Sequence, residues 1–235
     1  MLRSDNKNTY IIITIIIIGT LFTTYFITDI IHKSEINKLN NIYSNEIKEI
    51  KGNNINFSNI FIESLILYDS SSKDRLLGSY HFDLAFFFYN ETLKQNTKLN
   101  LDSYKNTSLD NCDKAQSLFY VSYLNYKSSK TLFNNSKKYA INNNFIKLID
   151  LYIDLTESGS KLTLFQYNSS RYLKQIIENI TFIDGLANQG NVTIILQLLY
   201  ENMTNYYNEL EIYEQLEDEI EMFDIFEFNP KREPS

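Results

Sequence analysis

Residues 115–140 read AQSLFYVSYLNYKSSKTLFNNSKKYA, and this stretch decides the fold. Its small and aromatic residues recur at alternating intervals of four and three, the heptad pattern of a helix that packs along one seam. The seam positions are Ala115, Phe119, Ser122, Tyr126, Ser129, Phe133, Ser136 and Ala140. Interdigitating core layers require such alternation of small and large residues. The pattern therefore predicts a long helix inside a bundle.

The same phase resumes after an Asn-rich turn at Asn142 to Asn144. The positions that continue it are Leu148, Tyr152, Leu155, Gly159, Leu162, Gln166, Ser169, Leu173, Ile176 and Ile180. Because the register survives Gly159, we predict one helix of about 38 residues in which that glycine costs about 1 kcal/mol relative to alanine. Alternatively, Gly159 marks a kink where another helix approaches closely.

Further helices are predicted on both sides of this pair. Asp184-Gly185 and Gln189-Gly190 are expected to end the second long helix, and a last helix runs from about Asn191 to Phe223. Its inward residues are Val192, Leu196, Leu199, Met203, Tyr206, Leu210, Tyr213 and Ile220.

Apolar residues at helical spacing before residue 98 predict three more helical segments. We expect a stop at Gly52 to Asn54, a break at Asp69 to Lys73, and a loop from Gln95 to Asp110. Candidate N-caps for the helix after that loop are Thr107, Ser108, Asp110 and Asn111. The fold class is therefore all-α: an up-down antiparallel bundle of three to four long helices.

An N-terminal transmembrane helix is predicted to precede the bundle. Residues 10–31 read YIIITIIIIGTLFTTYFITDII, and about 22 helical residues span roughly 33 Å, the thickness of a bilayer core. No small-x-small cleavage site follows, so an uncleaved anchor is favoured over a secretory signal or a buried core helix. The predicted organisation is a cytoplasmic tail (1–9), the anchor (10–31), a helical stalk (32–55), the bundle (56–225) and a flexible tail (226–235).

Potential N-glycosylation sites occur only after this apolar stretch. They are Asn56, Asn90, Asn106, Asn134, Asn168, Asn179, Asn191 and Asn202. Eight sites are a modest excess for an Asn-rich chain, and lysines on both sides of the span leave the positive-inside count undecided. We expect the domain after the span to lie outside the cytoplasm, with a membrane-tethered cytoplasmic bundle as the structural alternative.

The composition argues against most catalytic classes. The chain has 1 Cys and 2 His, too few for a disulfide framework, a Cys-based zinc site or a credible His-based triad. Its net charge of −7 argues against a general nucleic-acid binder. We therefore expect no enzyme, no cofactor, no metal and no nucleic-acid partner.

The candidate catalytic patterns are weak. Ser70-Ser71-Ser72-Lys73 and Ser158-Gly159-Ser160-Lys161 both have Ser-x-x-Lys spacing, without the motifs that accompany it in enzymes. His81 and Asp83 stand two residues apart, so on a helix they point to different sides. Cys112 is interpreted as a partly buried small side chain, or alternatively as the source of an intermolecular disulfide.

The last predicted helix is rich in acidic residues. The candidates for docking a partner are Glu209, Glu211, Glu214, Glu217, Asp218, Glu221 and Asp224, which could equally form a solvated face. Anchor and bundle together predict a protein that acts by binding, with the lipid bilayer and unidentified proteins as partners. It would serve as a cell-envelope or surface component or as an accessory subunit of a membrane complex. The alternative is a ligand-sensing module that signals through a partner.

Overall fold

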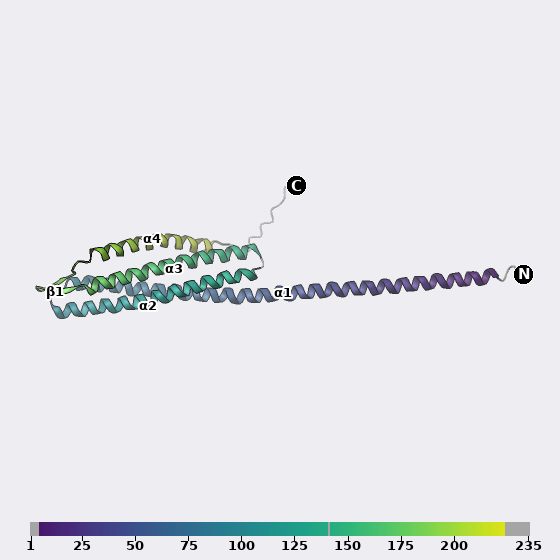
Figure 1. Ribbon diagram of the computed structural model, residues 1–235, viewed down its shortest axis with the longest axis horizontal. Coiled ribbons are helices and arrows are strands. Elements are labelled where there is room, and N and C mark those ends of the chain that lie inside the picture. The colour runs from purple at the N-terminus through teal and green to yellow at the C-terminus, as the bar shows by residue number, and fades with distance from the viewer. Residues whose placement is uncertain (1–4, 141, 224–235) are drawn as a thin grey trace, which may run out of the picture. The chain divides into compact units, whose positions relative to one another are not determined.

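The computed structural model describes the backbone of residues 5–140 and 142–223 and the side chains of residues 32–140 and 142–223 (Figure 1). The elements in order are α1 (Asp5–Leu93), α2 (Lys98–Ser136), a short 3-10 helix η1 (Lys137–Tyr139), α3 (Asn143–Glu178), β1 (Thr181–Ile183), β2 (Leu186–Asn188) and α4 (Thr193–Glu221). The prediction of an all-helical bundle is confirmed. The chain divides into two units, Met1–Gly52 and Asn53–Ser235.

In the first unit, every residue from 32 to 52 is exposed. No helix of the described residues is long and apolar enough to cross a membrane. The predicted span at 10–31 is helical but lies outside the residues whose side chains are described, and the predicted tail at 226–235 lies outside them altogether.

The second unit is built on small residues that recur every seven positions on three helices. In it the C-terminal part of α1 lies beside α2 and α3 (Figure 1). The small buried positions are Ser64, Ser71, Gly78, Ala85 and Thr92 on α1, Ser108, Ala115, Ser122, Ser129 and Ser136 on α2, and Thr156, Thr163 and Ser170 on α3. A seven-residue repeat keeps one face of a helix against its neighbour, so these positions form continuous seams.

Serine hydroxyls fix the register between α1 and α2. Ser129 Oγ donates to the carbonyl oxygen of Ser64 at 2.8 Å, and Ser122 Oγ donates to that of Ser71 at 2.7 Å. Two heptads further, Ser108 Oγ donates to the carbonyl of Ala85 at 2.6 Å. Each step of seven forward on α1 matches seven backward on α2, so the two helices run antiparallel. These bonds satisfy buried hydroxyls that would otherwise be costly to desolvate.

Aromatic layers alternate with the small ones. Phe133 stacks on Tyr152 with ring centroids 4.9 Å apart, and Phe61 meets Phe133 edge-on at 5.4 Å. One heptad further on, Gly159 lies against the Tyr126 ring, where an added Cβ would come within 2.7 Å of the ring carbons. Helix α3 thus runs unbroken through Gly159, and the glycine is there because α2 packs a tyrosine onto it.

The predicted seams on α2 and α3 are confirmed, but several predicted breaks are wrong. Helix α1 continues through both Gly52 to Asn54 and Asp69 to Lys73. Ser71 is a fully buried seam residue, so the serines there serve packing and not capping. The predicted loop from Gln95 to Asp110 is also wrong, because α2 begins at Lys98 with Thr97 as its N-cap. The Asn-rich polar residues of this stretch suggest a loop. In the structure the stretch is helical, and only one side of the helix is buried.

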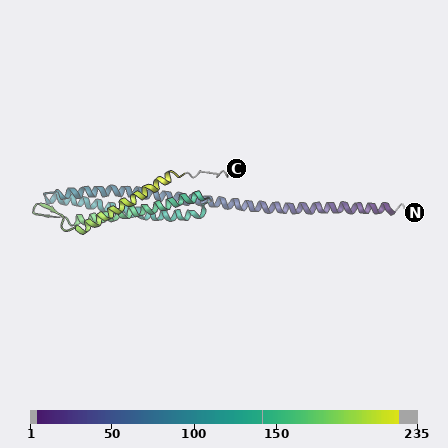
Figure 2. The same cartoon turned by 90° about the horizontal axis from the view of Figure 1, so that it is seen from above.

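Helix α4 packs more lightly than the others and crosses them at a slant (Figure 2). Its described residues include only two fully buried ones, Leu199 and Tyr213. A hairpin that was not predicted precedes it: β1 and β2 pair antiparallel with Ile183 opposite Leu186. Asp184 and Gly185 both have positive φ, 48° and 81°, which is the two-residue turn that Asp-Gly favours. These residues therefore turn a hairpin and do not cap α3.

Replacing the buried glycine tests the aromatic layer. We expect Gly159→Ala to lower the free energy of unfolding by about 1–3 kcal/mol, because the new methyl group overpacks against Tyr126. Gly52→Ala is the matched control: its Cβ meets nothing within 4 Å, so helix propensity should stabilise the chain by up to about 1 kcal/mol. Urea denaturation followed by circular dichroism measures both. Equal effects of the two substitutions would contradict the packing described for Gly159.

Candidate functional site

The predicted acidic face of α4 is divided between two roles. Glu211, Glu214, Asp218 and Glu221 are exposed. Glu209 is largely buried, and its Oε1 lies 3.7 Å from Lys161 Nζ on α3. Glu217 accepts a hydrogen bond from Tyr68 on α1 at 3.0 Å. Asp224 lies outside the described residues. Two of the predicted docking residues therefore hold α4 onto the bundle.

A tyrosine cluster joins α4 to α1 and α2. The hydroxyl oxygens of Tyr68 and Tyr213 lie 2.8 Å apart, and those of Tyr126 and Tyr213 lie 3.5 Å apart. The Arg75 guanidinium stacks over the Tyr213 ring at 5.0 Å. Burial raises the pKa of Tyr68 and of Tyr213 well above the usual phenol range, so both stay neutral. The cluster therefore holds α4 against α1 and α2 through hydrogen bonds within an otherwise apolar interface.

Arg75 is the most buried cation of the described residues, with 7% of its surface exposed. Burial disfavours its charge, but the phenol oxygens of Tyr126, Tyr213 and Tyr206 outweigh this and raise the pKa. Its Nε donates to no acceptor in the described structure. Sequence reasoning missed Arg75, although its heptad spacing from Tyr68 and Phe82 places it on the seam.

A cavity of about 240 Å³ opens beside this cluster, between α1, α3 and α4. It is lined by Ser79, Phe82, Asp83, Gln166, Ser169, Met203, Tyr206, Tyr207 and Leu210. Gln166 Nε2 donates to Ser79 Oγ at 2.7 Å, but Gln166 Oε1 is buried and accepts nothing in the described structure. Desolvation raises the pKa of Asp83. The cavity thus has aromatic walls, one carboxyl group and one unused acceptor.

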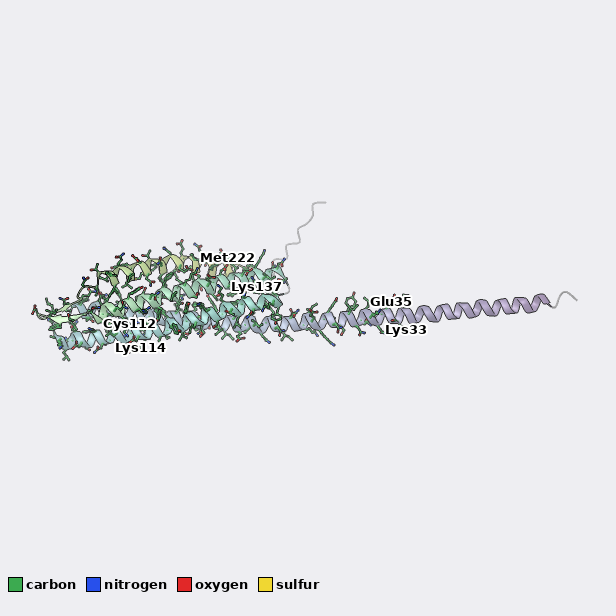
Figure 3. All side chains as sticks on the ribbon, viewed as in Figure 1. Lys33, Glu35, Cys112, Lys114, Lys137 and Met222 are labelled. Atoms are coloured by element: carbon green, nitrogen blue, oxygen red, sulfur yellow. The ribbon has the colours of Figure 1, made fainter. Side chains whose placement is uncertain are left out.

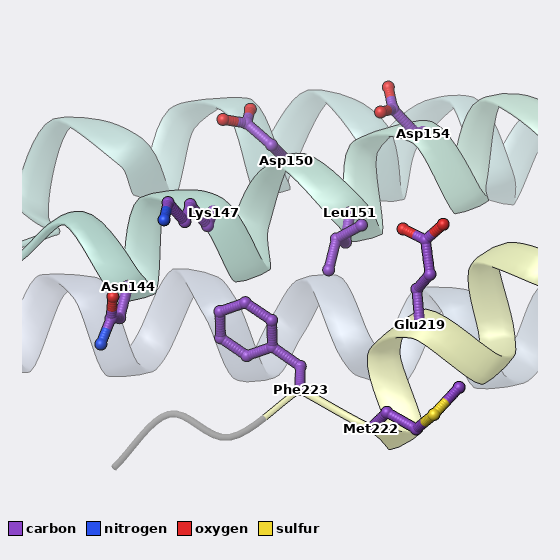
Figure 4. Close-up of a pocket in the computed structure, with 8 residues that line it drawn as sticks. All are labelled: Asn144, Lys147, Asp150, Leu151, Asp154, Glu219, Met222 and Phe223. Carbon is purple, nitrogen blue, oxygen red and sulfur yellow. The ribbon is translucent and has the colours of Figure 1, made fainter. Parts of the chain in front are cut away.

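Further hollows lie along α4, and two of them lie near its two ends. One of about 280 Å³ shares Met203 with the first cavity and is mostly apolar, with Leu173, Ile176 and Leu199 among its walls. The other is an open groove of about 750 Å³ between the start of α3 and the end of α4. In Figure 4 the Phe223 ring lies below Lys147 and Leu151 in this groove.

The predicted glycosylation sites differ in accessibility. Asn56, Asn90, Asn106, Asn134, Asn179 and Asn191 are exposed, whereas Asn168 and Asn202 are partly buried. Asn202 Nδ2, the atom that would carry a glycan, donates to Ser169 Oγ at 2.8 Å and to the Phe165 carbonyl. Four of the hydroxyl residues that complete these motifs are fully buried: Thr92, Ser108, Ser136 and Ser170. Core packing therefore accounts for part of the excess of motifs.

The weak catalytic patterns do not assemble into a catalytic site in the described structure. Lys73 pairs with Asp69 at 2.5 Å, and Lys161 faces Glu157 and Glu209. His81 Nδ1 lies 2.9 Å from Asn111 Oδ1. No three His, Cys, Asp or Glu side chains of the described residues group as metal ligands would.

Cys112 lies inside the bundle on α2 (Figure 3). Its thiol is fully buried, and burial together with Asp113 raises its pKa to about 12. The thiolate is the reactive form, so the thiol stays unreactive near neutral pH. The alternative of an intermolecular disulfide at Cys112 does not fit this fold, because the sulfur is out of reach of a partner.

Gln166 Oε1, which accepts no hydrogen bond in the described structure, leads to a prediction about stability. We expect Gln166→Leu to leave the free energy of unfolding unchanged or to raise it by about 1 kcal/mol, since it removes a buried unsatisfied oxygen. Ser79 keeps its bond to the Arg75 carbonyl. Asn111→Leu is the matched control, because Asn111 bonds both His81 and the Thr107 carbonyl and its loss should cost about 1–3 kcal/mol. Thermal denaturation compares them. A destabilised Gln166→Leu would mean that Gln166 is already satisfied.

Comparisons with known proteins add no assignment to these surfaces. The chain matches no protein-family model, and neither the curated proteins nor the solved structures contain a match. Function therefore has to be inferred from the faces and cavities of the bundle itself. Those are the cavity beside the tyrosine cluster, the acidic face of α4, and the apolar residues that the fold leaves exposed.

Proposed function

We propose that this chain is a single-pass membrane protein whose helical bundle lies outside the cytoplasm and acts by binding. In this role it is a cell-envelope or surface component, or an accessory subunit of a membrane complex. The apolar run at 10–31 supports the anchor, since its length suits a bilayer core. The exposed sequons after it support the outward orientation.

The observation that carries the binding role is an uncovered apolar face on α1. Two groups of apolar residues on one side of α1, Ile62 with Ile66 and Leu77 with Tyr80 and Phe87, are 48–63% exposed. The ion pair between Asp69 and Lys73 lies between them on the same side of the helix. The apolar residues lie away from the small-residue seam of α1. Exposed apolar residues that gather on one face are typical of an interaction surface, whereas scattered ones need no explanation. An amphipathic helix or another apolar protein face fits these two groups.

The anchor and its orientation can be tested together. We expect the full chain, expressed in cells that glycosylate, to remain in the membrane pellet after alkaline carbonate extraction and to lose mass on deglycosylation. Asn56→Gln and Asn191→Gln should each remove one glycan, because the asparagine and the hydroxyl residue of both motifs, Ser58 and Thr193, are exposed. Asn202→Gln should remove none, because Asn202 Nδ2 is bonded within the fold.

Deletion of residues 10–31 is the control for the anchor and should release the chain from the pellet. A C-terminal tag that is protected from protease in intact cells, together with unmodified sequons, would favour the alternative of a cytoplasmic bundle tethered to the membrane. Release of the full chain by carbonate would contradict the anchor itself.

If the chain acts by binding, the exposed apolar residues of α1 should contribute more to partner affinity than the acidic face of α4. We expect Ile62→Ser with Ile66→Ser to weaken partner association by about 2 kcal/mol, or about thirtyfold. The matched control is Glu214→Gln with Asp218→Asn on the outer face of α4, which should change association little. Both pairs are exposed, so neither should unfold the bundle.

Co-purification after mild detergent extraction at native expression measures this effect. If only the acidic variant loses partner association, the docking surface is the acidic face of α4 and not α1. The absence of any stable partner would count against a binding function.

Ligand sensing is a second candidate because of the cavity beside Gln166. Its aromatic walls and the Asp83 carboxyl suit a small molecule that carries hydrogen-bond donors. If a ligand uses Gln166 Oε1, then Gln166→Leu should stabilise the empty protein and abolish the ligand response, as expected where a site keeps an unsatisfied group for function.

A further inference from the structure

The part of the predicted stalk that belongs to the first unit is residues 32–52 of α1. We call this part the stalk from here on. It has an apolar seam that no described residue covers. Ile36, Tyr43, Ile47 and Ile50 are 51–57% exposed. No residue from 32 to 52 is buried. Most of the stability of a helix in a protein comes from the packing of one apolar face and not from intrinsic helix propensity. The stalk therefore has a face suited to packing that no described residue of the chain covers.

The seam follows a heptad pattern. Ile36, Tyr43 and Ile50 are seven residues apart, and Asn40, Ile47 and Asn54 form a second series offset by four. The two series are the d and a positions of a coiled coil. The same count continues along the sequence to Phe57, Phe61 and Ser64, which are the seam residues of the bundle.

Polar residues within the seam restrict the number and direction of partners. Asn40 and Asn54 occupy a positions, where a buried asparagine specifies register and oligomeric state at some cost in stability. An asparagine is best matched by the same residue from a second copy. This symmetry favours two parallel chains in register.

The charges beside the seam are complementary between two such chains. Glu46 precedes an a position and Lys51 follows a d position. In a parallel coiled coil, residues five apart at these flanking positions lie opposite each other across the interface. Glu46 of one copy thus meets Lys51 of the other, twice in a symmetric pair, and both residues are exposed in the single chain.

We propose that the occupant of this seam is a second copy of the chain, so that the stalks form a parallel two-stranded coiled coil. The parallel direction rests on the proposed membrane anchor, because two anchors in one bilayer place both stalks in the same sense. Association itself rests on the heptads and on the Glu46–Lys51 complementarity. Two bundles are thereby tethered side by side in one assembly.

Cysteine crosslinking in membranes tests the seam. Single variants Ile36→Cys, Tyr43→Cys and Ile50→Cys of the full chain should each form disulfide-linked dimers on mild oxidation. Asn41→Cys, on the opposite face of the stalk, should not. The wild-type chain is the background control, because Cys112 is fully buried. Crosslinking at Tyr43→Cys alone would indicate antiparallel stalks, and equal crosslinking at all four positions would indicate unspecific collision. Either result overturns the proposal.

Charge reversal provides a second readout in detergent solution. Glu46→Lys and Lys51→Glu should each raise the dimer dissociation constant several-fold, and the double variant should restore it. Glu49→Lys, which lies away from the seam, should change it little. Sedimentation equilibrium measures the dissociation constants of the wild-type chain and of these four variants. A chain that pellets with membranes yet stays monomeric would overturn the coiled coil and leave the anchor intact, whereas a dimer that carbonate extraction releases would contradict only the anchor.

Discussion

The bundle depends on a seven-residue spacing of small side chains on three helices. Serine, alanine, glycine and threonine at these positions let the helices come close enough for Ser108, Ser122 and Ser129 on α2 to donate to carbonyl oxygens of α1. The hydrogen bonds then set the antiparallel register, because a shift of one residue would leave three buried hydroxyls without acceptors. The aromatic layers fill the volume between the small ones, and Gly78 and Gly159 leave room for the rings of Phe119 and Tyr126.

Helix α4 is held by a different kind of contact. It contributes only Leu199 and Tyr213 as fully buried residues among those described, and Tyr213 reaches the core through a shared hydrogen-bond network. Next to that network Arg75 Nε has no acceptor among the described residues, and in the neighbouring cavity Gln166 Oε1 accepts no hydrogen bond from them. A helix attached through few buried contacts opens more easily than the three-helix core. The proposed ligand-sensing role would use this same side of the bundle, where the cavity beside Gln166 opens.

The heptad pattern of 115–180 was sufficient to predict the antiparallel pair α2 and α3, since its phase persists over many turns. The pattern failed where small residues lie on the seam among polar ones, as at Ser64, Ser71 and Ser108, because serine and asparagine are common in loops as well. The hairpin was missed because three-residue strands have too few positions to show alternation. The cavity and the unused atoms of Arg75 and Gln166 arise from contacts among three helices, which no local pattern records.

The sequence by itself determined that the chain is helical, where its long helices pack, and that one apolar run suits a bilayer, because periodicity and composition are local properties of the chain. Only the tertiary structure decided which polar residues are buried. Among the described residues of the predicted docking set, it separates Glu209 and Glu217, which hold α4, from Glu211, Glu214, Asp218 and Glu221, which face solvent. It also shows that no described residue covers several apolar residues on one side of α1. Whether a helix face is covered depends on how all the helices pack, which a local sequence pattern does not record.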